Sequence, residues 1–163
     1  MSQSSDKAIE NAIAEIRDVA NTPRDLQTLR AVRDLLISSG FAREVSNTLA
    51  RHHNEPDILN EMASRLEKAR FAFKDQIVER AHRHNLVSNF AIVGGAGVVG
   101  GAVVALATQS LLFPPLALVA MATGGYSAWR GSIENRRLSL EIAALNDIAD
   151  VLSRHIGKMQ SER

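Results

Sequence analysis

The chain has 163 residues, a formal net charge of +1 and no cysteine. That length suits one domain, and the balanced charge gives no reason to expect nucleic acid or strongly acidic partners. The lack of cysteine excludes disulfides and thiolate metal sites. The polar start, Met1 to Asp6, lacks the order of a secretory signal, so any route to a membrane is expected to be internal.

Residues 1–55 predict a small unit of three short amphipathic helices. Ile9, Ile13 and Ile16 recur at helical spacing in the first of them. Acidic and basic side chains are balanced and mixed throughout this region, as on solvated helix faces. We expect this unit to be cytoplasmic and to offer a docking surface to a protein partner.

Local signals divide these three helices. Thr22 is expected to cap the second helix with Pro23 at its first position, and Asp25 favours the positive helix start. Gly40 is expected to end that helix in a left-handed conformation. A third helix should then run to about His52.

Residues 56–89 predict a long stalk helix. Its start is signalled by Asn54 to Asp57, and no stop signal follows before the apolar part of the chain. We therefore expect one helix from about Asp57 through His84. Its apolar positions step by three and four, as in a coiled coil: Leu59, Met62, Leu66, Ala69 and Phe73.

Residues 90–129 predict a glycine-rich transmembrane hairpin. No Asp, Glu, Lys or Arg occurs from His84 to Trp129, about 46 residues, which is roughly the length of two membrane crossings. The two windows are Phe90 to Thr108 and Leu111 to Trp129. Pro114 and Pro115 would break or kink the first turn of the second window, so the hairpin turn is expected either between the two windows or from Thr108 to Pro115.

The borders of this run predict its orientation. Arg83 precedes it and Arg130 follows it, with further arginines on both sides, so the positive-inside rule places both termini in the cytoplasm. Tyr126 and Trp129 lie where interfacial aromatic anchors are expected.

Small residues recur along both predicted crossings, a pattern that lets helix backbones approach closely in lipid. The pattern leaves open whether the packing is within one chain or between chains. The candidate packing residues are Gly94, Gly97, Gly100, Gly101 and Ala105 in the first helix and Gly124 and Ala128 in the second.

Residues 130–163 predict a C-terminal heptad helix. The seam steps by four and three and includes Leu138, Ile142, Leu145, Leu152 and Ile156. We expect it to pair antiparallel with the stalk helix, so that residues 57–85 and 132–160 lie side by side. The spacing permits either an intramolecular bundle or an oligomeric coiled coil.

No pattern in the chain indicates catalysis. The stretch from Gly95 to Gly100 matches the GxGxxG dinucleotide motif, but it lacks the strand before it and the acidic residue after it that the motif needs. His82 and His84 lie on different helix faces, as do His52 and His53, so neither pair is expected to bind a metal. We therefore expect no enzyme, no metal and no cofactor.

The sequence therefore predicts an all-α integral membrane protein with a transmembrane hairpin, an antiparallel stalk and an N-terminal helical unit. In layout, residues 60–155 resemble bacterial two-transmembrane effectors of conflict and self-killing systems, without a diagnostic motif. We expect a protein of an inner or plasma-type membrane that self-assembles through its small residues into a homo-oligomer and acts as a pore-forming or membrane-permeabilising effector. The alternatives are a membrane anchor or scaffold that docks a partner, and a soluble bundle that hides an insertable hairpin.

Overall fold

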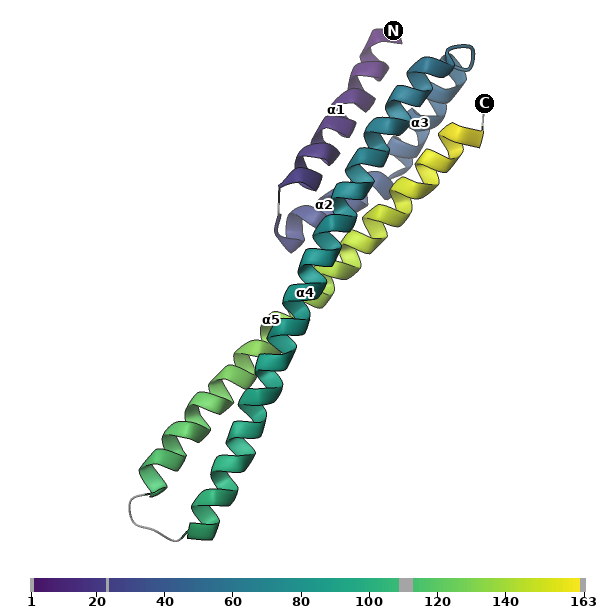
Figure 1. Ribbon diagram of the computed structural model, residues 1–163. Coiled ribbons are helices and arrows are strands. Elements are labelled where there is room, and N and C mark those ends of the chain that lie inside the picture. Colours follow the sequence, from purple (N-terminus) through teal and green to yellow (C-terminus); the bar gives the residue numbers. More distant parts are fainter. Residues whose placement is uncertain (1, 23, 109–112, 162–163) are drawn as a thin grey trace. The chain divides into compact units, whose positions relative to one another are not determined.

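The computed structural model describes residues 2–22, 24–108 and 113–161, without the side chains of residues 2–6, 8, 97, 100–102, 104–108, 113–117 and 120. Helix accounts for 94% of the structure, and the described residues form no strand, so the all-α prediction is confirmed. Figure 1 shows the five helices of the described residues: α1 (Ser2–Asn21), α2 (Leu26–Ile37), α3 (Ser39–Arg51), α4 (Pro56–Thr108) and α5 (Phe113–Ser161).

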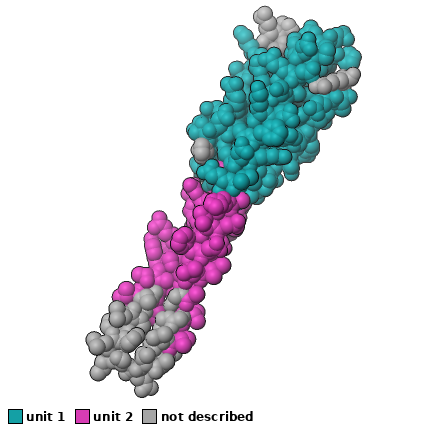
Figure 2. Space-filling model, in the orientation of Figure 1, with its two compact units in different colours: residues 1–79, 141–163 teal, residues 80–140 magenta. Residues whose placement is uncertain are grey.

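The chain divides into two compact units (Figure 2). Unit 1 comprises Met1–Glu79 and Glu141–Arg163, and unit 2 comprises Arg80–Leu140. Unit 1 therefore contains α1, α2 and α3 together with the first part of α4 and the last part of α5. Unit 2 contains the remainder of the two long helices, which form an antiparallel hairpin (Figure 1).

Unit 1 is a helical bundle with one apolar core to which all five helices contribute. Burial of these side chains is the main favourable term for its folding, at roughly 25 cal/mol per Å² of apolar surface. The core includes Ile9, Ile13, Ile16 and Val19 of α1, Leu29, Val32 and Leu36 of α2, Phe41, Val45 and Leu49 of α3, Leu59, Leu66 and Phe73 of α4, and Leu145, Ile148, Leu152 and Met159 of α5.

The start of α2 differs from the prediction. Asp25, in extended conformation, is the N-cap, and its carboxylate accepts a hydrogen bond from the Thr28 amide at 3.0 Å. The Thr22 amide instead donates to the Asp18 carbonyl at 3.1 Å, so Thr22 extends the end of α1. The prediction that Thr22 caps α2 was therefore wrong, and Pro23 lies outside the described residues.

The prediction that Gly40 ends α2 was also wrong. Helix α2 ends at Ile37, and Ser38 caps both helices: its hydroxyl donates to the Leu35 carbonyl at 2.6 Å and accepts from the Phe41 amide at 3.2 Å. Because Ser38 turns the chain with a negative φ, no left-handed residue is needed, and Gly40 lies inside α3. The predicted end of α3 near His52 is confirmed, since α3 ends at Arg51.

The end of α1 is held by a side chain of α4. The side-chain nitrogen Nε2 of Gln76 donates to the Val19 carbonyl at 3.2 Å and to the Ala20 carbonyl at 2.6 Å. These carbonyls lie in the last turn of α1, where a helix leaves its acceptors without partners inside the helix. Gln76 is buried, and these bonds account for a polar side chain at a position that otherwise faces the core.

The predicted long helix from about Asp57 through His84 is confirmed, because α4 begins with Pro56 at its first position and continues to Thr108. The stretch from Gly95 to Gly100 lies inside this helix, not after a strand. Helix α5 begins at Phe113, so Pro114 and Pro115 lie in its first turn, where proline is tolerated.

The C-terminal heptad positions face inward. Leu138, Leu145, Leu152 and Ile156 are buried, and Ile142 is half-buried. Leu145, Leu152 and Ile156 pack in the core of unit 1 with residues of this same chain. Ala144, Ile148 and Val151 are buried as well, so the buried face of α5 in unit 1 is wider than a two-stranded coiled-coil seam.

Within the described part of the chain, no helix has both the length and the apolarity that crossing a membrane requires.

Candidate functional site

The hairpin of unit 2 is packed through residues that have almost no side chain. A Cβ atom built on Gly124 would lie 2.8 Å from the carbonyl oxygen of Gly94 and 2.9 Å from Cγ2 of Val98. A Cβ atom on Gly94 would clash with the Ser127 hydroxyl and lie 3.2 Å from the Gly124 carbonyl oxygen. Only glycine allows this approach of the two backbones, so the small-residue packing at Gly94 and Gly124 is within one chain.

The same close packing continues one turn further along the hairpin. A Cβ atom built on Gly131 would lie 2.9 Å from Cβ of Ala91 and 3.7 Å from the Val87 carbonyl oxygen. Gly124, Ala128 and Gly131 are separated by steps of four and three, and they face Ala91 and Gly94 on α4. We call these five residues the small-residue seam.

Polar side chains near the seam bond mainly to their own helices. The Ser127 hydroxyl donates to the Gly124 carbonyl at 2.9 Å, and the Thr123 hydroxyl donates to the Val119 carbonyl at 2.9 Å. At the charged end of unit 2 a polar contact joins the two helices, since Nε2 of His84 lies 3.2 Å from the Ser139 hydroxyl.

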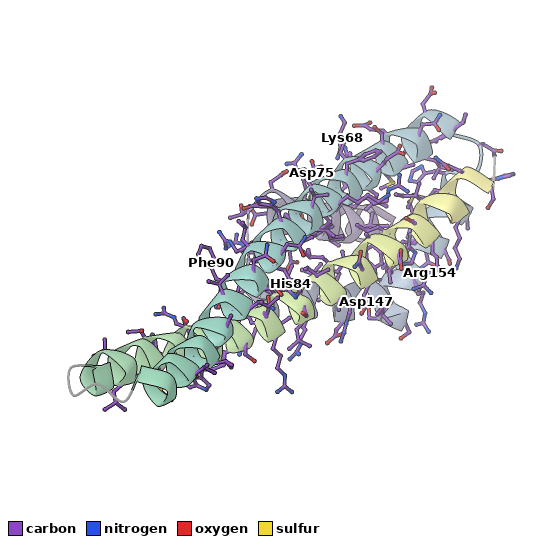
Figure 3. All side chains as sticks on the ribbon, turned by 60° about the horizontal axis from the view of Figure 1, so that its bottom comes forward. Lys68, Asp75, His84, Phe90, Asp147 and Arg154 are labelled. Atoms are coloured by element: carbon purple, nitrogen blue, oxygen red, sulfur yellow. The ribbon has the colours of Figure 1, made fainter. Side chains whose placement is uncertain are left out.

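The large apolar side chains of unit 2 point outward. In unit 1 most exposed positions are polar or charged, as at Lys68, Asp75, Asp147 and Arg154, whereas Phe90 of unit 2 is 73% exposed (Figure 3). The exposed large apolar residues described in unit 1 are Ile37, Ile58, Phe71 and Val78. Among the described residues of unit 2, the exposed large apolar ones are Leu86, Phe90, Ile92, Val93, Val99, Val103, Leu118, Val119, Tyr126, Trp129, Ile133 and Leu140.

The predicted anchor residues are also exposed. Arg83, Tyr126, Trp129 and Arg130 are all on the surface of unit 2. The Arg130 guanidinium donates to the Tyr126 hydroxyl at 3.3 Å, and the Tyr126 and Trp129 rings lie 6.2 Å apart between centroids. The only tyrosine and the only tryptophan of the chain are therefore neighbours beside the first charged residue after the apolar run.

The structure covers only part of the predicted packing set. Gly97, Gly100, Gly101 and Ala105 lie outside the residues whose side chains are described. Ala91, Ser127 and Gly131 also belong to the contact, but they are absent from the predicted set, which was based on small residues spaced four apart. Alternating steps of four and three, the heptad signal used for the C-terminal helix, would have found Gly131.

A second site, which is polar and was not predicted from the sequence, lies in unit 1. His155 is 7% exposed, and its Nε2 lies 3.3 Å from the Leu36 carbonyl oxygen. A carbonyl can only accept, so Nε2 carries the hydrogen. Nδ1 then holds a lone pair that is buried without a hydrogen-bond partner among the described residues. The ring meets Phe41 edge to face, with 5.1 Å between centroids, beside a cavity of about 190 Å³.

The surroundings of His155 favour its neutral form. Burial lowers the pKa of His155 below the ordinary value of 6.5, and the positive charges of Lys158 and Arg154 lower it further. The hydrogen bond to the Leu36 carbonyl raises the pKa, with an effect smaller than that of burial but larger than that of either positive charge. His155 is therefore a neutral ring that joins α5 to the corner between α2 and α3.

Within the described part of the chain, no three His, Asp or Glu side chains come together as a metal site would require. Comparisons with protein-family models, curated proteins and solved structures give no match to this chain. The site must therefore be interpreted from its own geometry.

Gly124→Leu and Gly125→Leu form a matched pair that tests the seam. Both remove a helical glycine and gain the same helix propensity, but a Cβ atom on Gly125 meets nothing within 4 Å. We expect Gly124→Leu to be less stable than Gly125→Leu by about 1–3 kcal/mol, the usual cost of overpacking. Denaturation followed by circular dichroism measures this difference, and equal stabilities would contradict the intrachain contact.

The lowered pKa of His155 predicts that the protein loses stability in mild acid. Its folded pKa is lowered, so the unfolded chain binds the proton more readily, and its contribution to stability is complete above pH 6.5. As the pH falls below 6.5 toward the folded pKa, that contribution is lost at up to about 1.4 kcal/mol per pH unit.

Denaturation midpoints between pH 7.5 and 5 measure this effect. We expect His155→Gln to reduce the pH dependence, because glutamine can still donate to Leu36 but does not titrate in this range. The exposed His53→Gln serves as the control and should keep the full dependence. A His155→Gln profile identical to that of the unmodified protein would reject the assignment.

Proposed function

We propose that this protein is a membrane-anchored helical bundle. In this proposal the hairpin 90–129 inserts into a bilayer, and unit 1 stays in the aqueous phase. The observation that carries the proposal is the inverted arrangement of unit 2, in which glycine, alanine and serine form the helix contact and the large apolar side chains face out. In lipid, the hydrophobic effect does not drive helices together, so small residues at the contact and large ones outside are the favourable order.

In water the same arrangement is unfavourable. A fully exposed side chain of the size of Phe or Val forgoes roughly 1.5–3 kcal/mol of burial energy, and exposed apolar patches of this extent mark contact with a partner or a membrane. The charge-free run from His84 to Trp129 favours lipid as that contact, because protein interfaces keep a polar rim.

A hidden hairpin is less well supported. For α1, α2 and α3 to cover it, each would need an apolar face that is not already in use. Their apolar side chains, such as Ile13, Val32 and Val45, are already buried in the core of unit 1. Among the large apolar side chains described on these helices, Ile37 of α2 is the exposed one, and it is too small to cover both Phe90 and Trp129.

The charges support one orientation. Arg83 and Arg130 flank the apolar run, and Arg136 and Arg137 follow on the same side. With no charge in the connection between the two helices, the positive-inside rule favours both termini on the cytoplasmic side of an inner or plasma-type membrane.

Assembly into a permeabilising oligomer is the second candidate. Cβ atoms built on Gly95 and Gly125 meet nothing within 4 Å, so two glycines face outward, where a second copy could approach. The Thr123 and Ser127 hydroxyls bond to their own helix backbones, and the described part of the hairpin therefore offers little polar lining for a conducting path. We therefore place the anchor first.

Val99→Lys and Val78→Lys test the insertion. The two valines lie on α4 and are 65% and 69% exposed, in unit 2 and unit 1 respectively. A lysine costs about 2.5–3.5 kcal/mol in the centre of a membrane helix, whereas surface substitutions in water change stability by about 0.5 kcal/mol or less. We expect Val99→Lys alone to shift protein from the membrane fraction to the supernatant or to aggregates. Unmodified protein that stays in the supernatant without detergent would refute insertion.

Dye-loaded vesicles separate the two candidates. An anchor leaves the vesicles sealed at high protein density, whereas a permeabilising oligomer releases the dye. If release occurs, Gly125→Leu should abolish it, because leucine there blocks approach of a second copy and leaves the intrachain seam intact. Release that survives both Gly95→Leu and Gly125→Leu would exclude assembly through these outward glycines.

A further inference from the structure

A groove of about 510 Å³ runs between the two helices of unit 2, beside the border of the charge-free run. Val87 and Phe90 of α4 line one wall, and Tyr126, Arg130 and Glu134 of α5 line the other. The three residues of α5 are four apart and share one helix face. We call this feature the hairpin groove.

Charge along the hairpin groove has a defined order. Counted from the charge-free run, Arg130 is the first charged residue of α5 and Glu134 is the second. Four helical residues separate them by roughly 6 Å along the helix axis. The guanidinium of Arg130 is held by the Tyr126 hydroxyl at 3.3 Å, which uses one of its five N–H donors.

The opposite wall adds an aromatic ring between the two charges. Gly131 faces Ala91, so Phe90, the neighbour of Ala91, lies across from Gly131, between the levels of Arg130 and Glu134 along α5. Phe90 is 73% exposed and lines the same groove as Glu134. A carboxylate together with an aromatic face is a favourable environment for an ammonium group.

From the apolar run outward, the hairpin groove thus offers aromatic surface, a guanidinium and then a carboxylate beside an aromatic ring. A phospholipid has the matching order of acyl chain, phosphate and headgroup amine. We propose that the hairpin groove binds a phospholipid with an ethanolamine headgroup, with its phosphate on Arg130 and its ammonium between Glu134 and Phe90. This inference rests on the proposed membrane insertion.

The charges of the groove select among headgroups. Arg130 and Glu134 balance each other, as the phosphate and ammonium of ethanolamine phospholipids do. A purely anionic headgroup would leave Glu134 without a positive partner and facing a like charge. A choline headgroup keeps the positive charge but has no N–H to donate to the carboxylate.

Trp129 is a built-in reporter for this site. It is the only tryptophan of the chain, and its ring lies 6.2 Å from that of Tyr126, which lines the groove. The full-length protein is reconstituted into vesicles of equal parts phosphatidylethanolamine and phosphatidylcholine. Bromine is placed near the glycerol end of the acyl chains of one lipid or the other, and quenching of tryptophan fluorescence measures which lipid lies beside Trp129.

We expect brominated phosphatidylethanolamine to quench with an apparent preference of about threefold over brominated phosphatidylcholine, the scale of one exposed charge-assisted contact. Glu134→Gln and Arg130→Gln should each remove the preference. Arg136→Gln, on the same helix but outside the groove lining, should keep it.

Each contrary result has a separate meaning. Equal quenching by the two lipids in the unmodified protein overturns the lipid site while insertion stands. Absence of quenching by either lipid overturns insertion itself. Stronger quenching by brominated phosphatidylglycerol, increased further in Glu134→Gln, would assign the groove to anionic lipid and reject the ethanolamine site.

Discussion

The close approach of two backbones at Gly94 and Gly124 determines how the side chains of unit 2 are arranged. With no Cβ atom on either residue, the helix contact is made by backbone and by Ala91, Ala128 and Gly131. So narrow a contact leaves little room for large side chains beside Val98, and residues such as Ile92 and Val99 lie on the outer surface. The exposed apolar surface is therefore a direct consequence of the glycine contact.

Unit 1 has the opposite arrangement, with large apolar side chains inside, although parts of the same two helices form it. There α4 contributes Leu66 and Phe73 to the inside, and α5 contributes Leu145 and Leu152. These side chains are large, and their burial in water stabilises the bundle. Their outward faces carry the charges that a water-facing helix needs. Each long helix thus follows one packing rule in unit 1 and its reverse in unit 2.

How much of this could be read from the sequence depends on the range of the interaction. Periodicity and charge reach only a few residues along the chain, and they predicted the all-helical fold, the uninterrupted α4 and the end of α3. Local signals did not determine the start of α2, because Thr22 and Asp25 are both good capping residues. The structure shows that Asp25 is the N-cap, since its carboxylate accepts from the Thr28 amide.

Contacts between individual side chains of distant segments were beyond this kind of prediction. The partner of His155 is the carbonyl of Leu36, 119 residues away, and a backbone carbonyl leaves no mark in the sequence. The hairpin groove likewise depends on Phe90 and Glu134 lying on facing helices, which requires the register of the hairpin. Gly131 lies seven residues before Leu138 and faces Ala91, so extending the heptad of α5 toward its start identifies one residue that fixes this register.

That heptad explains how one helix can serve both units. Steps of four and three run without interruption along α5 through Gly124, Ala128, Gly131, Asn135, Leu138, Ile142, Leu145, Ala149, Leu152, Ile156 and Met159. The spacing stays constant along α5, and the residues at these positions change from glycine and alanine near its start to leucine, isoleucine and methionine near its end.

Asn135 lies between these two parts of the heptad, and its side-chain oxygen is buried without a hydrogen-bond partner among the described residues. A polar residue at such a position lowers stability but fixes register. Because register decides which residues face outward, it also sets Tyr126, Arg130 and Glu134 on one face of the helix, where the hairpin groove requires them.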